Sequence, residues 1–102
     1  MPKGYWIAGV DVKDAEAYKT YVAANGAAFA KFGARFIVRG GAMENPEGHA
    51  RARNVVIEFP SFEAAKACYH SPEYAAAHAI RRNAAESDLI IIEGYDGPQP
   101  GQ

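Results

Sequence analysis

The sequence has little cysteine: Cys68 is the only one among 102 residues. A single thiol cannot form a disulfide within the chain, so the fold does not rely on an oxidising compartment. Cys68 also has no neighbouring base in the sequence. Its environment therefore favours a small buried side chain over a nucleophile.

The sequence also lacks a strong charge of one sign and a long apolar run. Lysine and arginine number 11 and aspartate and glutamate number 12, which leaves a net charge of −1. This balance gives no support to a nucleic-acid binder or a polybasic membrane anchor. No apolar run approaches the roughly 20 residues of a membrane span, and the N-terminal MPKGYWIAGV lacks the features of a signal peptide. We expect a soluble cytoplasmic protein that binds neither nucleic acid nor membrane.

Motifs for metals and cofactors are missing as well. The three histidines have no metal-ligand spacing, and Pro72 interrupts the helical register between His70 and His78. Gly40 and Gly41 do not follow a strand-to-helix turn, so they do not form a phosphate cradle. We therefore expect no metal and no cofactor.

The length and a hydrophobic share of 49% suit one compact domain, which we place at residues 1–97. The proline- and glycine-containing residues 98–102 are expected to form a flexible tail.

The stretch RNVVIEFPSFEAAKACYHSPEY, residues 53–74, contains most of the local signals. Its β-branched run predicts a buried strand at residues 54–59, which Pro60 ends because proline cannot donate to a sheet ladder. Ser61 is the expected N-cap of a short helix. Ser71 followed by Pro72 repeats the signal for a second helix that reaches about Glu86.

The remaining segments complete an alternating pattern. Strands are predicted at residues 5–10, 34–39 and 89–95, and apolar residues at helical spacing predict a helix from Asp14 to Phe32, with Gly33 as its left-handed stop. The order strand, helix, strand, strand, helix pair, strand is that of the ferredoxin-like split βαβ fold. This is an α+β arrangement with a four-stranded antiparallel sheet, its first and third strands central and its helices on one face.

Alternation along the strands divides their side chains between a helix-covered face and an open face. We assign three apolar sets to the covered face: residues 6, 8 and 10; 36 and 38; and 55, 57, 59, 90 and 92. The open face then carries Arg35, Arg39, Glu58 and Glu93 among tyrosine and aliphatic side chains. An apolar patch of this extent is larger than soluble monomers usually expose. We therefore predict a homodimer that packs sheet against sheet.

Several phrases together resemble one known family. GYWIAGVDV, ARFIVRGG, NVVIEFPS, CYHSPEY and IIIEGYDG, spread from Gly4 to Gly97, are similar to the bacterial domain-of-unknown-function family numbered 1330. One departure is Ala15, where that family often has proline. The resemblance implies a dimeric α+β barrel with a pocket between sheet and helices. Relatives in that superfamily include cofactor-free monooxygenases, but the family has no settled activity, so it assigns no catalytic residue.

The candidate site residues come from polar and aromatic positions near the expected pocket. We nominate Glu58 and His70 as proton-transfer residues. Substrate-binding candidates are Trp6, Arg39, Ser71 and Tyr74, with Arg39 holding an anion. The structural alternatives are an Arg39–Glu58 ion pair, an exposed or capping His70, and aromatic rings that only fill the core.

Two functional hypotheses remain open. The first is a cofactor-free enzyme that acts on a small aromatic or carboxylated compound. The second is a non-catalytic dimeric module that binds a metabolite or has only a structural role. The sequence contains no nucleophile–base pair that would decide between them.

Overall fold

The computed structural model describes residues 2–101, so Met1 and Gln102, the outer ends of the expected domain and tail, lie outside the described residues. Three helices and four strands follow in the expected order. They are β1 (Gly4–Val12), α1 (Ala15–Lys31), β2 (Arg35–Arg39), β3 (Arg53–Phe59), α2 (Phe62–Tyr69), α3 (Pro72–Ala84) and β4 (Ala85–Glu93). No helix in this part of the chain is long and apolar enough to cross a membrane.

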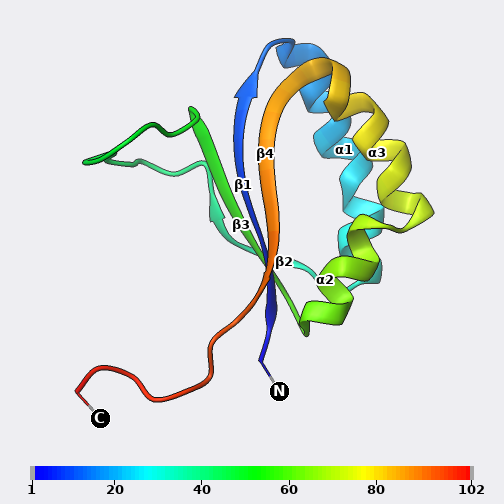
Figure 1. Ribbon diagram of the computed structural model, residues 1–102. Coiled ribbons are helices and arrows are strands. Elements are labelled where there is room, and N and C mark those ends of the chain that lie inside the picture. The colour runs from blue at the N-terminus through cyan, green and yellow to red at the C-terminus, as the bar shows by residue number, and fades with distance from the viewer. Residues whose placement is uncertain (1, 102) are drawn as a thin grey trace.

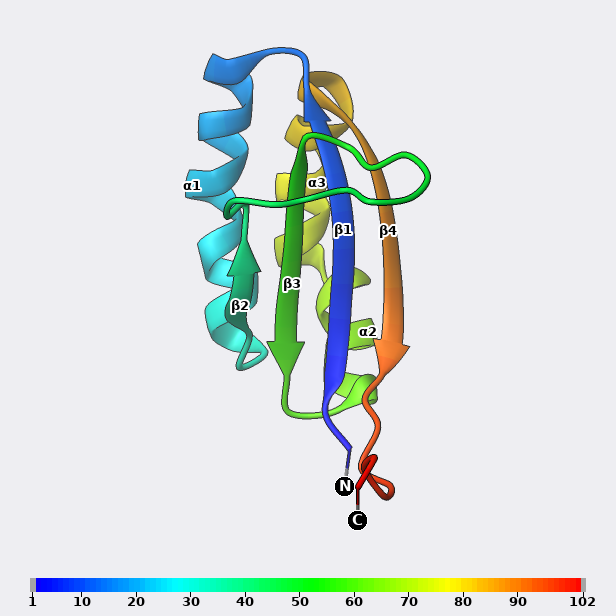
Figure 2. The same ribbon diagram turned by 90° about the vertical axis from the view of Figure 1, so that its left-hand side faces the viewer.

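The strands form one antiparallel sheet in the order β2-β3-β1-β4. All three helices lie on one face of the sheet, and the other face is uncovered (Figures 1 and 2). The predicted ferredoxin-like α+β fold, with its first and third strands in the middle, is therefore confirmed.

The predicted helix caps are present. Asp14 accepts a hydrogen bond from the backbone N–H of Ala17, Ser61 from Ala64 and Ser71 from Tyr74, at 3.0–3.1 Å. Each bond satisfies one of the amide groups that a helix start leaves unpaired. Gly33 has a φ of 71°, as expected for the left-handed stop after α1.

The end of the last helix differs from the prediction. α3 ends at Ala84, before the predicted Glu86, and β4 begins at once with Ala85. The register pairs Ala85 with Val12, so β4 follows β1 to its end. Pairing with a central strand outweighs the helix propensity of alanine in this segment.

The predicted faces are correct for β1 and β3 and wrong for β4. Leu89 and Ile91 pack against the core, whereas Ile90 and Ile92 are 54% and 44% exposed on the open face. The register explains this, because Ile90 pairs with Ile7 on the open side of β1. The predicted strand begins at Leu89 and so leaves out Glu86 and Asp88, the polar residues that share the phase of Ile90 and Ile92.

Strand β2 contains an irregularity that changes the position of Arg39. Phe36 pairs with Ile57, but the next paired residue is Val38, opposite Val56, followed by Arg39 opposite Val55. An extra residue in one strand moves every later side chain to the other face. Val38 therefore lies on the open face and Arg39 on the helix-covered face, the reverse of the prediction. The suggested Arg39–Glu58 ion pair is excluded by this placement.

Trp6 occupies the centre of the core and is 1% exposed. Its indole N–H donates to the carbonyl oxygen of Ala65 at 2.8 Å, which joins β1 to α2. The rings of Phe29, Phe59, Tyr69 and Tyr74 surround it at centroid distances of 4.8–5.7 Å.

Replacing Trp6 with phenylalanine should lower the free energy of unfolding by about 2–4 kcal/mol, because it leaves a cavity and removes a buried hydrogen bond. Urea unfolding monitored by circular dichroism measures this loss. Tyr95→Phe, in the exposed tail, is the control and should change stability by less than about 0.5 kcal/mol. A Trp6→Phe protein as stable as the control would show that the indole is not central to the core.

Candidate functional site

A hollow lies between the sheet and α1. The hollow holds about 460 Å³ of empty space when its open mouth is included. Within it, a water molecule can be centred in a region of only about 40 Å³. A ligand larger than a few water molecules therefore enters only if side chains at the mouth move. The lining consists of Trp6, Ala8, Val10, Tyr18, Tyr21, Val22, Asn25, Phe29, Phe36, Arg39, Arg53, Val55, Ile57, Arg81 and Leu89.

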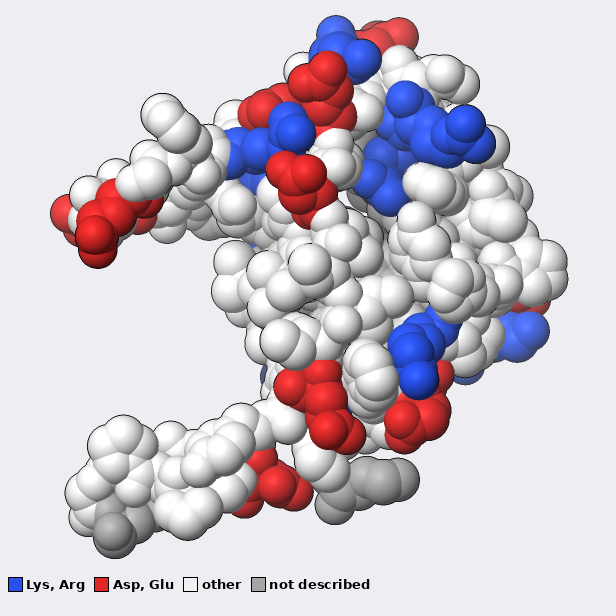
Figure 3. Space-filling model, in the orientation of Figure 1, with Lys and Arg blue, Asp and Glu red and all other residues white. Residues whose placement is uncertain are grey.

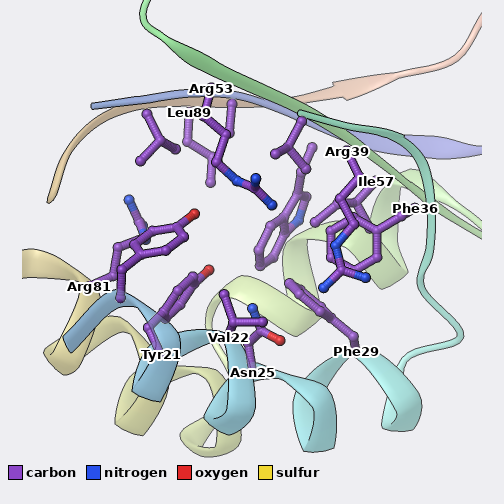
Figure 4. Close-up of a pocket in the computed structure, with 15 residues that line it drawn as sticks. Tyr21, Val22, Asn25, Phe29, Phe36, Arg39, Arg53, Ile57, Arg81 and Leu89 are labelled. Atoms are coloured by element: carbon purple, nitrogen blue, oxygen red, sulfur yellow. The ribbon is translucent and has the colours of Figure 1, made fainter. Parts of the chain in front are cut away.

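Three arginines from three elements converge on this largely apolar space. Arg39 comes from β2, Arg53 from β3 and Arg81 from α3. Figure 4 shows the guanidinium groups of Arg39 and Arg53 pointing into the space between sheet and α1, with Arg81 at the opposite end. Among the described residues, the lining contains no aspartate or glutamate, and no ion pair joins any of these arginines to a carboxylate.

Two of these guanidinium groups contain buried nitrogens without a partner. The Nε atoms of Arg53 and Arg81 have no hydrogen-bond partner among residues 2–101, and Arg81 is only 7% exposed. Buried donors are nearly always satisfied, so an unpaired one indicates a missing acceptor such as water or a ligand.

Each of the three guanidinium groups makes a cation–π contact with an aromatic ring. The Arg39 guanidinium carbon lies 4.0 Å from the centre of the Phe36 ring, and those of Arg53 and Arg81 lie 5.9 and 5.8 Å from Tyr18 and Tyr21. Such cation–π contacts hold a guanidinium in place without neutralising it. The hollow thus keeps its positive charge available.

A pair of buried tyrosines adds a neutral hydrogen-bond donor. The hydroxyl groups of Tyr21 and Tyr74 are 2.8 Å apart, and Tyr21 lines the hollow. Burial raises the pKa of both phenols, so both stay protonated near neutral pH. The hydrogen bond between the two hydroxyl groups uses one of their two protons, so the other proton can be donated to another group.

The structure brings together two of the six nominated site residues. Trp6 and Arg39 line the hollow. Tyr74 lies fully buried behind Tyr21, and Ser71 caps α3 and donates to the carbonyl of Cys68 at 2.7 Å.

The two residues nominated for proton transfer lie elsewhere. Glu58 is on the open face of the sheet, where Tyr5 Oη donates to its carboxylate at 3.3 Å. His70 is exposed at the C-terminal end of α2. Their role in proton transfer stays a prediction.

Neither Arg53 nor Arg81 is among the residues nominated from the sequence. Both carry a readable signal. Arg53 precedes Val55, Ile57 and Phe59 by even steps, so alternation places it on the covered face. Arg81 follows Ala77 by four residues on the buried side of α3.

A family model described as "Domain of unknown function (DUF1330)" matches residues 3–95. No curated protein matches this chain significantly.

Solved structures with the same fold come from several bacteria. RPA0582 from Rhodopseudomonas palustris, a protein of unknown function, is 21% identical, with a TM-score of 0.69 over 94% of this chain and 85% of that one. SnoaB from Streptomyces nogalater, a cofactor-independent oxygenase, is 11% identical, with a TM-score of 0.67 over the whole of both chains. A dimeric protein of unknown function with a ferredoxin-like fold from Bacteroides fragilis is 19% identical, with a TM-score of 0.52 over 89% and 95%.

Cys68 should be inert in the folded protein. It is fully buried, and burial, followed by the charge of Glu73, raises the pKa of its thiol to about 12. Because the thiolate is the reactive form, Ellman's reagent should not modify the native protein at pH 8, whereas one thiol per chain should react in urea. Native labelling at the denatured rate would contradict this burial.

Proposed function

We propose that this chain, which belongs to the DUF1330 family, binds a small organic anion with an aromatic or otherwise apolar body in the hollow between sheet and α1. One observation carries the proposal: Arg39, Arg53 and Arg81 line the hollow, and none of its described lining residues carries a carboxylate. Hydrogen bonds to charged groups contribute roughly 1.5–3 kcal/mol, so two guanidinium groups suffice to select a carboxylate over a neutral analogue.

The remaining lining accounts for the apolar body of the ligand. Trp6, Phe29 and Phe36 present ring surfaces, and Val55 and Ile57 present aliphatic ones. Pockets of this kind bind mainly by apolar contact and orient the ligand by a few polar groups. Arg39 is exposed and lies over Phe36 at the edge of the hollow, so a change of its rotamer would widen the entrance.

A cofactor-free enzyme is one form of this function, and the similarity in fold to the oxygenase SnoaB supports it. In that case the guanidinium groups and the Tyr21 hydroxyl would stabilise negative charge that develops on the bound compound. The absence of histidine, aspartate and glutamate from the described lining favours the alternative, a binding module without catalysis. Alanine at both Glu58 and His70 tests the remaining proton-transfer candidates, because turnover that survives in this double variant excludes both residues.

The proposal includes a homodimer, because the open face of the sheet exposes several apolar side chains. Ile7, Val38, Ile90 and Ile92 are each 43–54% exposed there. Residues 40–52 and 94–101 project from the same side of the molecule (Figure 1), and the surface between them is largely uncharged (Figure 3). A second copy packed on this face would cover the apolar side chains. The neighbour from Bacteroides fragilis is described as dimeric, which supports a dimer for this fold.

Benzoate and its neutral amide, benzamide, test the anion site. Isothermal titration calorimetry should show that benzoate binds more tightly than benzamide and that Arg53→Gln weakens benzoate binding by about tenfold or more. Arg82→Gln is the matched control, because Arg82 is exposed on α3 outside the hollow. Equal binding of the two probes, or an equal loss in the control variant, would contradict the proposal.

Native mass spectrometry of the freshly purified protein tests the dimer. We expect a dimer that Ile90→Glu converts largely to monomer, because a carboxylate would be buried without a partner. Ala79→Glu, an exposed position on α3, should leave the dimer intact. A monomeric parent protein at micromolar concentration would refute the assembly.

A further inference from the structure

A second, wider hollow lies where the end of α2, the side of α3 and the edge strand β4 meet. The centre of a water-sized sphere reaches about 430 Å³ of it, so it is far more open than the first hollow. Its lining consists of Tyr69, His70, His78, Arg81, Ser87, Leu89 and Ile91. Only Arg81 and Leu89 also line the first hollow.

Two buried polar atoms of this lining have no hydrogen-bond partner. They are Nε of Arg81 and Oγ of Ser87, unpaired among residues 2–101. Arg81 is 7% exposed, and Ser87 lies opposite Val10 on the helix-covered side of β4. Arg81 and Ser87 come from different elements and line the same hollow, so a small movement of each side chain would let both buried donors reach one bound acceptor.

The two histidines extend this donor set. Both rings contact Tyr69, His70 at 5.3 Å and His78 at 5.6 Å between centroids, so both lie beside the same ring. Burial, together with the charges of Arg81 and Arg82, lowers the pKa of His78. No aspartate or glutamate belongs to the described lining, so no carboxylate of this hollow neutralises the charge of Arg81.

We infer that this second hollow binds a tetrahedral oxyanion, such as a phosphate group, through Arg81, Ser87, His70 and His78. Donors from α2, α3 and β4 approach from three sides, which suits a group that presents several strong acceptor oxygens in three dimensions. A planar carboxylate offers only two oxygens and would leave part of this set unused. The inference goes beyond the proposed function, because it requires neither Arg39 nor Arg53.

Inorganic phosphate is the probe, and the readout is the set of backbone amide shifts in two-dimensional NMR. Titration should shift the amides around His78 and Ser87, and Ser87→Ala should weaken phosphate affinity about tenfold. His70→Gln combined with His78→Gln should weaken it at least as much. Arg53→Gln changes the first hollow only, so it should leave phosphate affinity unchanged. A negative result for benzoate in the first hollow can therefore be distinguished from a negative result for phosphate in the second.

Melting temperature separates a ligand-binding Ser87 from a structural one. Removal of a buried hydroxyl that has no partner should leave the melting temperature without phosphate unchanged or higher, and should reduce the increase that phosphate produces. Arg82→Gln is the control for surface charge and should keep most of the phosphate affinity. The inference is overturned if Ser87→Ala lowers the melting temperature without phosphate, if Arg82→Gln weakens binding equally, or if phosphate shifts no amide of this lining.

Discussion

Strand β1 pairs with both β3 and β4, and the placement of most other side chains follows from this pairing. It runs from Gly4 to Val10 on one side and from Gly4 to Val12 on the other. Because side chains alternate along a strand, this double register decides which residues of three strands face the helices. It places Trp6 in the core, where the indole bond to Ala65 holds α2 against the sheet. It also turns Ile7 and Ile90 outward onto the open face.

The pairing of the strands also places positively charged side chains on the helix-covered face of the sheet. Arg53 follows the covered phase of β3, and the bulge in β2 turns Arg39 to that face as well. Burying a guanidinium among apolar side chains costs free energy unless the charge is paired or solvated. Here each guanidinium lies near an aromatic ring, and Arg39 is also exposed to solvent. An anionic ligand would supply acceptors for the Nε atoms of Arg53 and Arg81, which have none among the described residues.

Arg81 connects the two hollows. Its side chain lies between the space under α1 and the wider space beside β4, and it is nearly buried. Anions bound on both sides would share this guanidinium, so each would alter the affinity for the other. The ion pairs among the described residues join Lys19, Lys31 and Arg51 to carboxylates, and none of them involves an arginine of the two hollows.

The element order, the ferredoxin-like fold and the caps at Asp14, Ser61 and Ser71 could all be predicted from the amino-acid sequence. These features follow from local signals, namely periodicity, capping hydroxyl and carboxylate groups, and the stop at Pro60. The sequence also correctly placed Glu58 on the open face, because the polar residues Asn54 and Glu58 share one phase of β3, and it correctly placed Trp6 on the covered face of β1.

The phase of β4 and the position of Arg39 depend on how the strands pair. In β4 the three consecutive isoleucines carry no phase of their own, and the polar residues Glu86 and Asp88, which share the phase of Ile90 and Ile92, belong to the strand only because it pairs with β1 from Ala85 onward. In β2 a single bulge, which depends on the pairing with β3, reverses the face of every residue that follows it. The convergence of Arg39, Arg53 and Arg81 has the same origin, because residues far apart in the chain meet only when strands and helices pack. Local patterns predict elements, whereas a binding site depends on contacts between elements.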